Sequence, residues 1–251
     1  MNLVILSGKM VVTEVGKVGH PMTVRVTAIS IVDAIAIDLR TRLFAGELTP
    51  DVPLTETEIA TSYDVARPTA KAAIEKLVGE GLLVRGVHKT AHVVELGPDS
   101  VRDIYLARAY LESEVLRRLA RTRTVPDGAV QANRDIAAVG EGSAMAVVEP
   151  DMRFHTSLID AVGNERTSKM YRSLVSEVRL CMTRVQSLHL LGTALIQAEH
   201  QKILELIGAG EGDGAALLLD AHLGRARERL VAAIGGEAGP EADLPSDLVP
   251  R

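Results

Sequence analysis

The first clear repeat of hydrophobic positions lies between Thr27 and Ala45, where aliphatic residues follow one another at intervals of four. These residues are Ile31, Ile35, Leu39 and Leu43. Such a spacing places side chains on one face of an α-helix, so the stretch predicts an amphipathic helix. The glycine that follows Ala45 predicts the end of this helix.

Two shorter helices are predicted after a turn that contains two prolines. Thr55 and Glu58 form a capping-box pattern, which predicts a short helix that runs to about Tyr63. Another helix is predicted over Arg67–Gly79, and Gly81 marks the break that follows it. The side of this helix that we expect to be buried consists of Ala70, Ala73, Ile74 and Leu77.

A β-hairpin is predicted next, because two aliphatic stretches, Leu82–Val84 and His92–Val94, flank a polar tip. The order helix, helix, turn, helix, hairpin is that of a winged helix-turn-helix, which we assign to residues 27–97. Residues 1–26 mix Val, Gly, Thr and Lys without a clear period. We therefore predict no stable element in this N-terminal extension.

The rest of the chain is predicted to be helical, which makes the fold class mainly α. After a linker at Gly97–Asp99, residues 98–235 form an all-α domain. Its six helices are predicted at about 100–122, 126–140, 143–162, 166–188, 191–209 and 212–234. Residues 236–251 are rich in Gly, Pro, Asp and Glu, which predicts a frayed tail. Within the tail, Leu248–Arg251 match the beginning of a thrombin cleavage site, and we expect them to come from an expression vector.

Composition narrows the class of protein. Hydrophobic residues make up 47% of the 251 residues and charged residues 24%, the balance of a soluble globular protein, while aromatics at 2% imply an aliphatic core. Cys181 is the only cysteine, so no intramolecular disulfide can form and a reducing compartment is expected. No apolar run approaches the ~20 residues that span a bilayer. We therefore expect a cytoplasmic protein with no membrane partner.

The predicted recognition helix carries two basic residues on one face. Arg67 and Lys71 lie four residues apart, opposite the side that we expect to be buried, and long donors there can reach DNA bases and phosphates. Further DNA contacts are expected from the same helix, the preceding helix and the wing, namely from Thr69, Thr55, Thr57, Arg85, His88 and Lys89. The alternative is an ordinary solvated helix face, because residues 23–98 contain eight Lys or Arg against ten Asp or Glu.

The order of motifs in this region resembles the GntR family of transcriptional regulators. The resemblance covers about residues 28–96, and it rests on Gly46–Pro50, Leu54–Ala60, Val65–Thr69 and Leu77–Val84. It implies a winged helix-turn-helix that binds operator DNA. Ala66 stands where the family usually has Ser, and Thr57 replaces a common Arg. These departures bear on the operator sequence and the affinity rather than on the fold.

Four residues in the helical domain suit a divalent metal ion. Asp151 and His155 are four residues apart and so project from one face of a helix, while His200 and His222 lie on the last two predicted helices. One carboxylate and three imidazoles gathered inside a bundle suit Zn, Ni or Mn. From the residues alone, the alternative that Asp151 and His155 form an ordinary hydrogen bond stays open.

The same region resembles the FCD ligand-binding domain of the FadR-type branch of the GntR family, in its shorter, VanR-like form. Asp151–His155 is similar to the family's D-x-x-F-H, Glu199–Leu204 to its E-H-x-x-I-L, and Gly212–His222 to its closing helix with a terminal His. The metal ligands that this resemblance implies are Asp151, His155, His200 and His222.

Two effector-binding positions also follow from this resemblance. Arg108 and Glu112 fit the family's R-x-x-x-E, in which the Arg faces the effector pocket, so Arg108 is implied to hold a carboxylate of the effector. Asn164 fits the Asn that follows the D-x-x-F-H helix, and we expect it at the effector as well. For Arg108, an intrahelical ion pair with Glu112 is the alternative.

Together these features predict a homodimeric transcriptional regulator, a repressor rather than an enzyme. A dimer is expected because helix-turn-helix proteins recognise near-palindromic operators. A small organic acid, bound near the metal ion, would change the affinity for the operator. Two alternatives stay open, namely a regulator that responds to the metal itself and a metal-dependent hydrolase.

Overall fold

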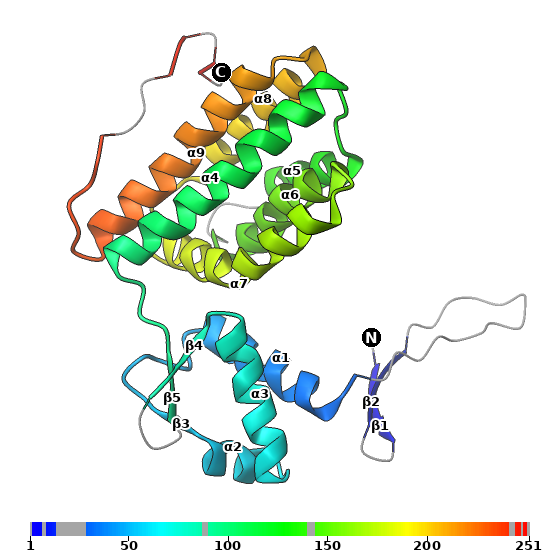
Figure 1. Ribbon diagram of the computed structural model, residues 1–251, viewed down its shortest axis with the longest axis vertical. Helices are drawn as coiled ribbons and strands as arrows, with labels where there is room; N and C mark the ends of the chain where they lie inside the picture. The colour runs from blue at the N-terminus through cyan, green and yellow to red at the C-terminus, as the bar shows by residue number, and fades with distance from the viewer. Residues whose placement is uncertain are drawn as a thin grey trace, which may run out of the picture. The chain divides into compact units, whose positions relative to one another are not determined.

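The computed structural model describes residues 29–86, 90–139, 144–240, 244–246 and 248–249, together with the backbone of two strands near the N-terminus. The chain divides into two compact units, Met1–Val94 and Glu95–Arg251, and each is described by itself (Figure 1). The border falls before Glu95, whereas the sequence places it after Gly97. The fold is mainly helical, as predicted.

Three helices form the body of the first unit: α1 (Ile31–Phe44), α2 (Glu56–Ser62) and α3 (Arg67–Gly79). Both α1 and α2 pack against α3. The apolar side of α3 that the sequence predicts is fully buried, and it consists of Ala70, Ala73, Ile74 and Leu77. The helical periodicity therefore identifies the core of this unit correctly.

Side-chain caps decide where two of these helices begin. The hydroxyl of Ser30 accepts a hydrogen bond from the backbone N–H of Asp33 at the start of α1. At the start of α2, Thr55 and Glu58 form the predicted capping box, in which each side chain accepts from the backbone N–H of the other residue. These caps satisfy N–H groups that have no partner within the helix.

A three-stranded antiparallel sheet in the order β3–β5–β4 forms the wing. Strand β4 (Leu83–Arg85) pairs with β5 (Thr90–Val93), as the predicted hairpin requires. Strand β3 (Leu54–Thr55) pairs with the other edge of β5. The sequence does not predict β3, because a strand of two residues is too short to show an alternation of polar and apolar positions.

The N-terminal extension, for which the sequence predicts no stable element, contains two paired strands. These are β1 (Asn2–Leu6) and β2 (Lys9–Thr13), which run antiparallel with Asn2 opposite Thr13. The prediction for residues 1–26 is therefore wrong over these strands. Both strands are rich in aliphatic and β-branched residues, which favour extended backbone even where no alternation is evident.

The second unit contains six α-helices within the residues that the structure describes, in agreement with the prediction. They are α4 (Pro98–Arg121), α5 (Asp127–Ala137), α6 (Val148–Ala161), α7 (Glu165–Ser187), α8 (Thr193–Ala209) and α9 (Gly212–Ala233). A short 3-10 helix, Ala144–Val147, leads into α6. Helices α4 and α9 lie side by side along much of their length (Figure 1).

Aliphatic side chains fill the core of this bundle, with Tyr105, Phe154 and Tyr171 as its buried aromatic residues. Leu248 also belongs to this core at 5% exposure, so the tail that we expected to be frayed is anchored at this residue. Within the described part of the chain, no helix combines the length and the hydropathy that crossing a membrane requires.

The junction between α8 and α9 depends on a glycine. Gly210 has a φ of +87°, a left-handed conformation that allows the N–H groups of Gly210 and Glu211 to bond back to the carbonyls of Ile207 and Leu206. A side chain there would strain the backbone. This turn matters for function because α8 and α9 each contribute one histidine to the candidate site.

We expect Gly210→Ala to lower the free energy of unfolding by about 1 kcal/mol, because alanine populates the left-handed conformation poorly. Gly214→Ala is the matched control. A Cβ at Gly214 would make only ordinary contacts, the nearest at 3.5 Å, and should stabilise α9 by about 0.5 kcal/mol. Chemical denaturation of the two variants measures both effects. Equal stabilities would contradict the role of Gly210.

Candidate functional site

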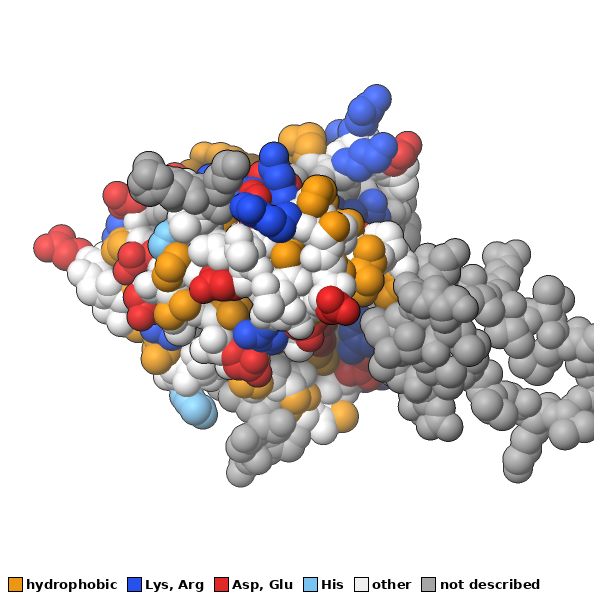
Figure 2. Space-filling model, turned by 90° about the horizontal axis from the view of Figure 1, so that it is seen from below, with side chains coloured by type: hydrophobic (Ala, Val, Ile, Leu, Met, Phe, Trp, Pro, Cys, Tyr) orange, Lys and Arg blue, Asp and Glu red, His pale blue; other side chains and the backbone are white. Residues whose placement is uncertain are grey.

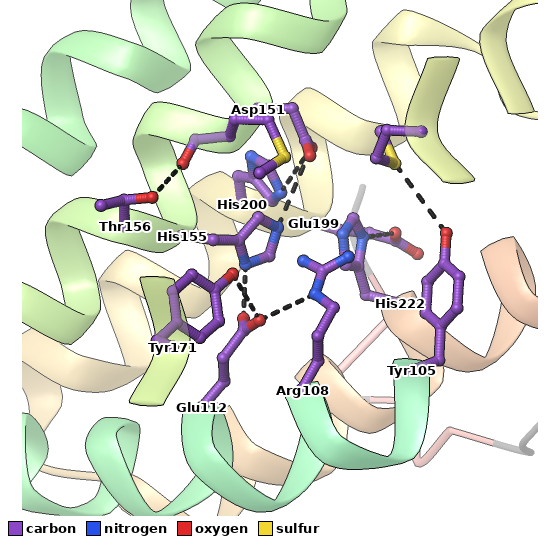
Figure 3. A network of polar contacts seen from close by, with 12 residues as sticks. Tyr105, Arg108, Glu112, Asp151, His155, Thr156, Tyr171, Glu199, His200 and His222 are labelled. Atoms are coloured by element: carbon purple, nitrogen blue, oxygen red, sulfur yellow. Dashed lines mark hydrogen bonds and ion pairs between the residues drawn. The ribbon is translucent and has the colours of Figure 1, made fainter. Parts of the chain in front are cut away.

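Four polar side chains meet inside the aliphatic bundle. Asp151 and His155 come from α6, His200 from α8 and His222 from α9, and each is at most 5% exposed. Each offers one donor atom, and these atoms lie within 4.8 Å of one another. Figure 3 shows the four side chains pointing toward one another. The structure thus brings together all four residues that the sequence proposes as metal ligands.

The carboxylate of Asp151 faces two of the imidazoles. Its Oδ1 is 3.6 Å from Nε2 of His200 and 3.9 Å from Nε2 of His155, too far for hydrogen bonds. Both carboxylate oxygens of Asp151 are buried without a hydrogen-bond partner among the described residues. A buried carboxylate that lacks partners is costly, and a cation between these donor atoms would remove the cost.

The ring of His155 is oriented by Glu112. Nδ1 of His155 lies 2.5 Å from Oε2 of Glu112. Burial would raise the pKa of Glu112, but the neighbouring His155 and Arg108 outweigh burial and hold this pKa below its usual range. An ionised carboxylate only accepts hydrogen bonds, so Nδ1 is the donor, which turns Nε2 toward the cluster. That Nε2 is buried and has no hydrogen-bond partner among the described residues.

A second carboxylate orients His222 in the same way. Nδ1 of His222 donates to Oε2 of Glu199 at 2.8 Å, which leaves Nε2 for the cluster. Arg225 donates to the other oxygen of Glu199 and balances its charge. Such carboxylate–imidazole pairs are the usual support of histidine ligands, because they select the tautomer and make the ligand more basic.

His200 is held by packing instead of by a carboxylate. Its ring stacks on that of Phe154, with the centroids 3.7 Å apart and the planes 2° from parallel. Burial and the neighbouring His222 and His155 lower the pKa of His200 well below that of an ordinary histidine. Burial also lowers the pKa of His222. Both rings are therefore neutral near pH 7, which is the form that binds metal ions.

Arg108 lies directly beside the cluster. It is 1% exposed, and its Nε donates to Oε1 of Glu112 at 2.9 Å, while the hydroxyl of Tyr171 donates to the same oxygen at 2.9 Å. Nη2 of Arg108 is buried and has no hydrogen-bond partner among the residues that the structure describes. The intrahelical ion pair that the sequence allows is thus formed, and the guanidinium still has a donor left for a ligand. The two interpretations of Arg108 are compatible.

Asn164, which the sequence predicts at the effector, is not brought together with the four residues of the cluster. It is exposed and forms the N-cap of α7, where its Oδ1 accepts from the backbone N–H groups of Arg166 and Thr167. The chain turns after α6 at Gly163, which has a φ of +70°. An Asn at this point caps the next helix, which explains its presence without any ligand.

The recognition helix of the first unit presents its basic residues to solvent. Arg67 and Lys71 are exposed on α3, and Thr69 between them is half-buried. In α2, Thr57 is exposed, while Thr55 is used as the helix cap. On the described part of the face drawn in Figure 2, basic side chains are interspersed with acidic ones. By composition, residues 23–98 contain eight Lys or Arg against ten Asp or Glu, which agrees with this mixture of charges.

Arg85 in the wing is engaged within the protein, which differs from the prediction that it contacts DNA. Its Nε donates to Glu75 of α3 at 3.1 Å, and its Nη2 lies 3.4 Å from Glu56 of α2. The guanidinium thus ties strand β4 to both helices. The other two predicted wing residues, His88 and Lys89, lie outside the described residues.

Two functional roles are missing from the sequence prediction, namely those of Glu112 and Glu199 as supports of the histidines. Both residues occur in the quoted motifs, but their partners are 43 and 23 residues away. Only the packing of α4 against α6, and of α8 against α9, brings each pair together. A histidine on a neighbouring helix leaves no local spacing signal.

Two protein families match different parts of the chain, one on each side of the border before Glu95. Residues 31–93 match the bacterial regulatory proteins of the gntR family, and residues 103–225 match the FCD domain. The Nta operon transcriptional regulator of Aminobacter aminovorans is 25% identical over 191 residues, which are 74% of this chain and 88% of that protein.

Solved structures show the same fold. The chain is similar to a GntR transcriptional regulator from Rhodococcus sp. RHA1, with a TM-score of 0.69 and 21% identity over 82% of this chain and 99% of that one. E. coli McbR/YncC is similar with a TM-score of 0.60 and 16% identity, over 82% of this chain and 97% of that one.

Glu199→Gln is expected to weaken the binding of Zn²⁺ by about 10- to 100-fold, because the charge that pairs with His222 is lost while the shape is kept. Competition with a chromophoric chelator measures the affinity. Glu205→Gln is the control, since Glu205 is exposed on the same helix and contacts Gln201. Equal affinities of the two variants would show that Glu199 does not support the metal site.

Proposed function

Because the chain belongs to the GntR family of bacterial regulatory proteins and carries an FCD domain, we propose that it represses transcription as an effector-controlled homodimer. It is a transcriptional regulator rather than an enzyme. Beyond that, we propose that a divalent metal ion occupies the cluster in the helical unit. A small organic acid would bind beside this ion and change the affinity for operator DNA.

One observation carries the metal proposal: the buried donor atoms of the cluster have no partners within the described protein. The buried atoms without a partner include both oxygens of Asp151, Nε2 of His155 and Nε2 of His200. An oxygen donor combined with imidazole nitrogens suits Zn, Ni or Mn. A bound ion of this kind supplies Lewis acidity, which favours a carboxylate as its additional ligand.

Arg108 supports an acid as the effector. Its guanidinium is permanently charged, and its unpartnered Nη2 lies beside the cluster. A carboxylate at this point would gain a charge-assisted hydrogen bond from Arg108 as well as contact with the ion. Glu112 remains the partner of Nε, so the effector does not have to break an existing ion pair.

DNA binding is proposed to depend on the exposed face of α3. Helix-turn-helix proteins insert this helix into the major groove, and a dimer places two such helices on a near-palindromic site. An acid that binds more tightly to the form that is off the DNA must weaken operator binding by the corresponding factor. The mechanism can therefore be tested by measuring the affinity for operator DNA with and without the acid.

Arg67→Ala is expected to weaken operator binding by about tenfold or more, the loss of one good base contact. The probe is a duplex selected by the wild-type protein from a random-sequence pool, and fluorescence anisotropy measures the affinity. Lys76→Ala is the control, because it removes one charge from the same helix at a residue paired with Asp33. Equal effects of both variants would argue for a purely electrostatic contact.

Organic acids that bind the metal-loaded protein are expected to lower its affinity for the same duplex. Arg108→Lys keeps a charge beside Glu112 but lacks the forked donors of arginine, so this variant should bind DNA normally and lose about tenfold in acid affinity. Calorimetry and anisotropy measure the two affinities. Operator affinity that is unchanged by every acid that binds would overturn the effector role. A response to metal addition alone would indicate a metal sensor.

A further inference from the structure

A second set of buried polar atoms without partners lies outside the metal cluster. Gln186 on α7 is 0% exposed, and both its Nε2 and its Oε1 lack a hydrogen-bond partner among the described residues. A buried amide of this kind is costly to fold unless something else satisfies it. No contact in the described protein does so.

Helix α7 packs against α4, and two contacts between these helices show which residues lie at the same height. At one level, the hydroxyl of Tyr171 contacts Glu112, and at another the hydroxyl of Tyr105 lies 4.0 Å from Sδ of Met182. Gln186 follows Met182 by four residues and therefore shares its face of α7. Gln186 thus lies one helical turn beyond Met182 along α7, on the side away from Tyr171.

Arg108 lies between this amide and the metal ligands. Its guanidinium carbon is 5.5 Å from the centre of the Tyr105 ring, and Figure 3 shows both side chains rising from α4 in the same direction. The hydroxyl of Tyr105 belongs to a side chain that is 1% exposed, and its hydrogen-bond contact within the described residues is the weak one with sulfur. The seam between α4 and α7 therefore carries, in order, Arg108, Tyr105 and Gln186, each with hydrogen-bonding capacity that is not used.

We propose that Tyr105 and Gln186 form the far end of the effector pocket whose near end is Arg108 and the metal cluster. This inference rests on the proposed function, and it narrows the effector to a class. The effector is a carboxylate that carries an uncharged hydrogen-bonding group, such as a hydroxyl, keto or carboxamide group, at its opposite end. The carboxylate binds at Arg108, and the uncharged group reaches the amide of Gln186.

The chemistry of the far end disfavours a second carboxylate. A glutamine amide and a phenol are neutral, and burial raises the pKa of Tyr105, so its hydroxyl stays protonated. Arg229 on α9 donates to the backbone oxygen of Leu190. A carboxylate placed between two neutral groups would be buried without a counter-charge, whereas a hydroxyl can both donate to and accept from the amide.

Calorimetry on the full-length, Zn²⁺-loaded protein tests this class with matched probes: hexanoate, 6-hydroxyhexanoate and adipate, with their four- and five-carbon homologues. In the wild type, the best hydroxy acid is expected to bind about tenfold more tightly than the plain acid and the diacid of equal length. Gln186→Leu should abolish this preference for the hydroxy acid. Gln201→Leu, an exposed site on α8, should keep the preference.

Melting of the ligand-free variants adds a second readout. Gln186→Leu should melt no lower than the wild type, because leucine of similar size removes a buried amide that has no partner. A preference that survives in Gln186→Leu, or a wild type that binds all three acids equally, overturns the inference and leaves the proposed function standing. If no acid of any length binds the wild type, the acid effector itself is wrong and the inference fails with it.

Discussion

The helical unit is organised around one constraint, which is that ionisable groups are buried in a core of aliphatic side chains. Asp151, His155 and His200 are almost fully shielded from water, and their inward-facing atoms have no partner among the described residues. Such an arrangement is expensive in an apolar interior, and neighbouring groups must compensate for it. On the side that faces away from the cluster, the carboxylate of Glu112 pairs with Nδ1 of His155, and that of Glu199 pairs with Nδ1 of His222. The inner side stays available to a cation.

This constraint also explains why the helices are arranged as they are. The donor groups and their supports come from α4, α6, α8 and α9, so the cluster forms only when these four helices pack together. An ion bound there joins α6, α8 and α9 and leaves α4 to present Arg108. Binding and folding of such a site are coupled, because the unfolded chain does not hold the donors in place.

The two units differ in how far their functional side chains are buried and held in place by neighbours. In the helical unit, the residues of the site are buried, close together and mutually oriented. In the first unit, Arg67 and Lys71 are exposed on a helix whose surroundings carry balanced charge. Arg85 is engaged by Glu75 and Glu56 and stabilises the wing. Residues 31–93 match the gntR family of bacterial regulatory proteins, and the operator sequence of such a unit depends on contacts that form only with DNA.

The sequence by itself determined the helices and the winged order of elements, because a period of 3.6 residues is local information. The four residues that meet in the cluster were predicted through the resemblance of their motifs to a known family, and spacing alone left an ordinary Asp151–His155 hydrogen bond open. Only the tertiary structure decided which residues support the site, that Asn164 caps a helix, and that Arg85 pairs with Glu75 and Glu56. The physical reason is that orientation and desolvation depend on neighbours from distant segments. The direction of a side chain and its loss of water follow from packing, which spacing along one helix does not specify.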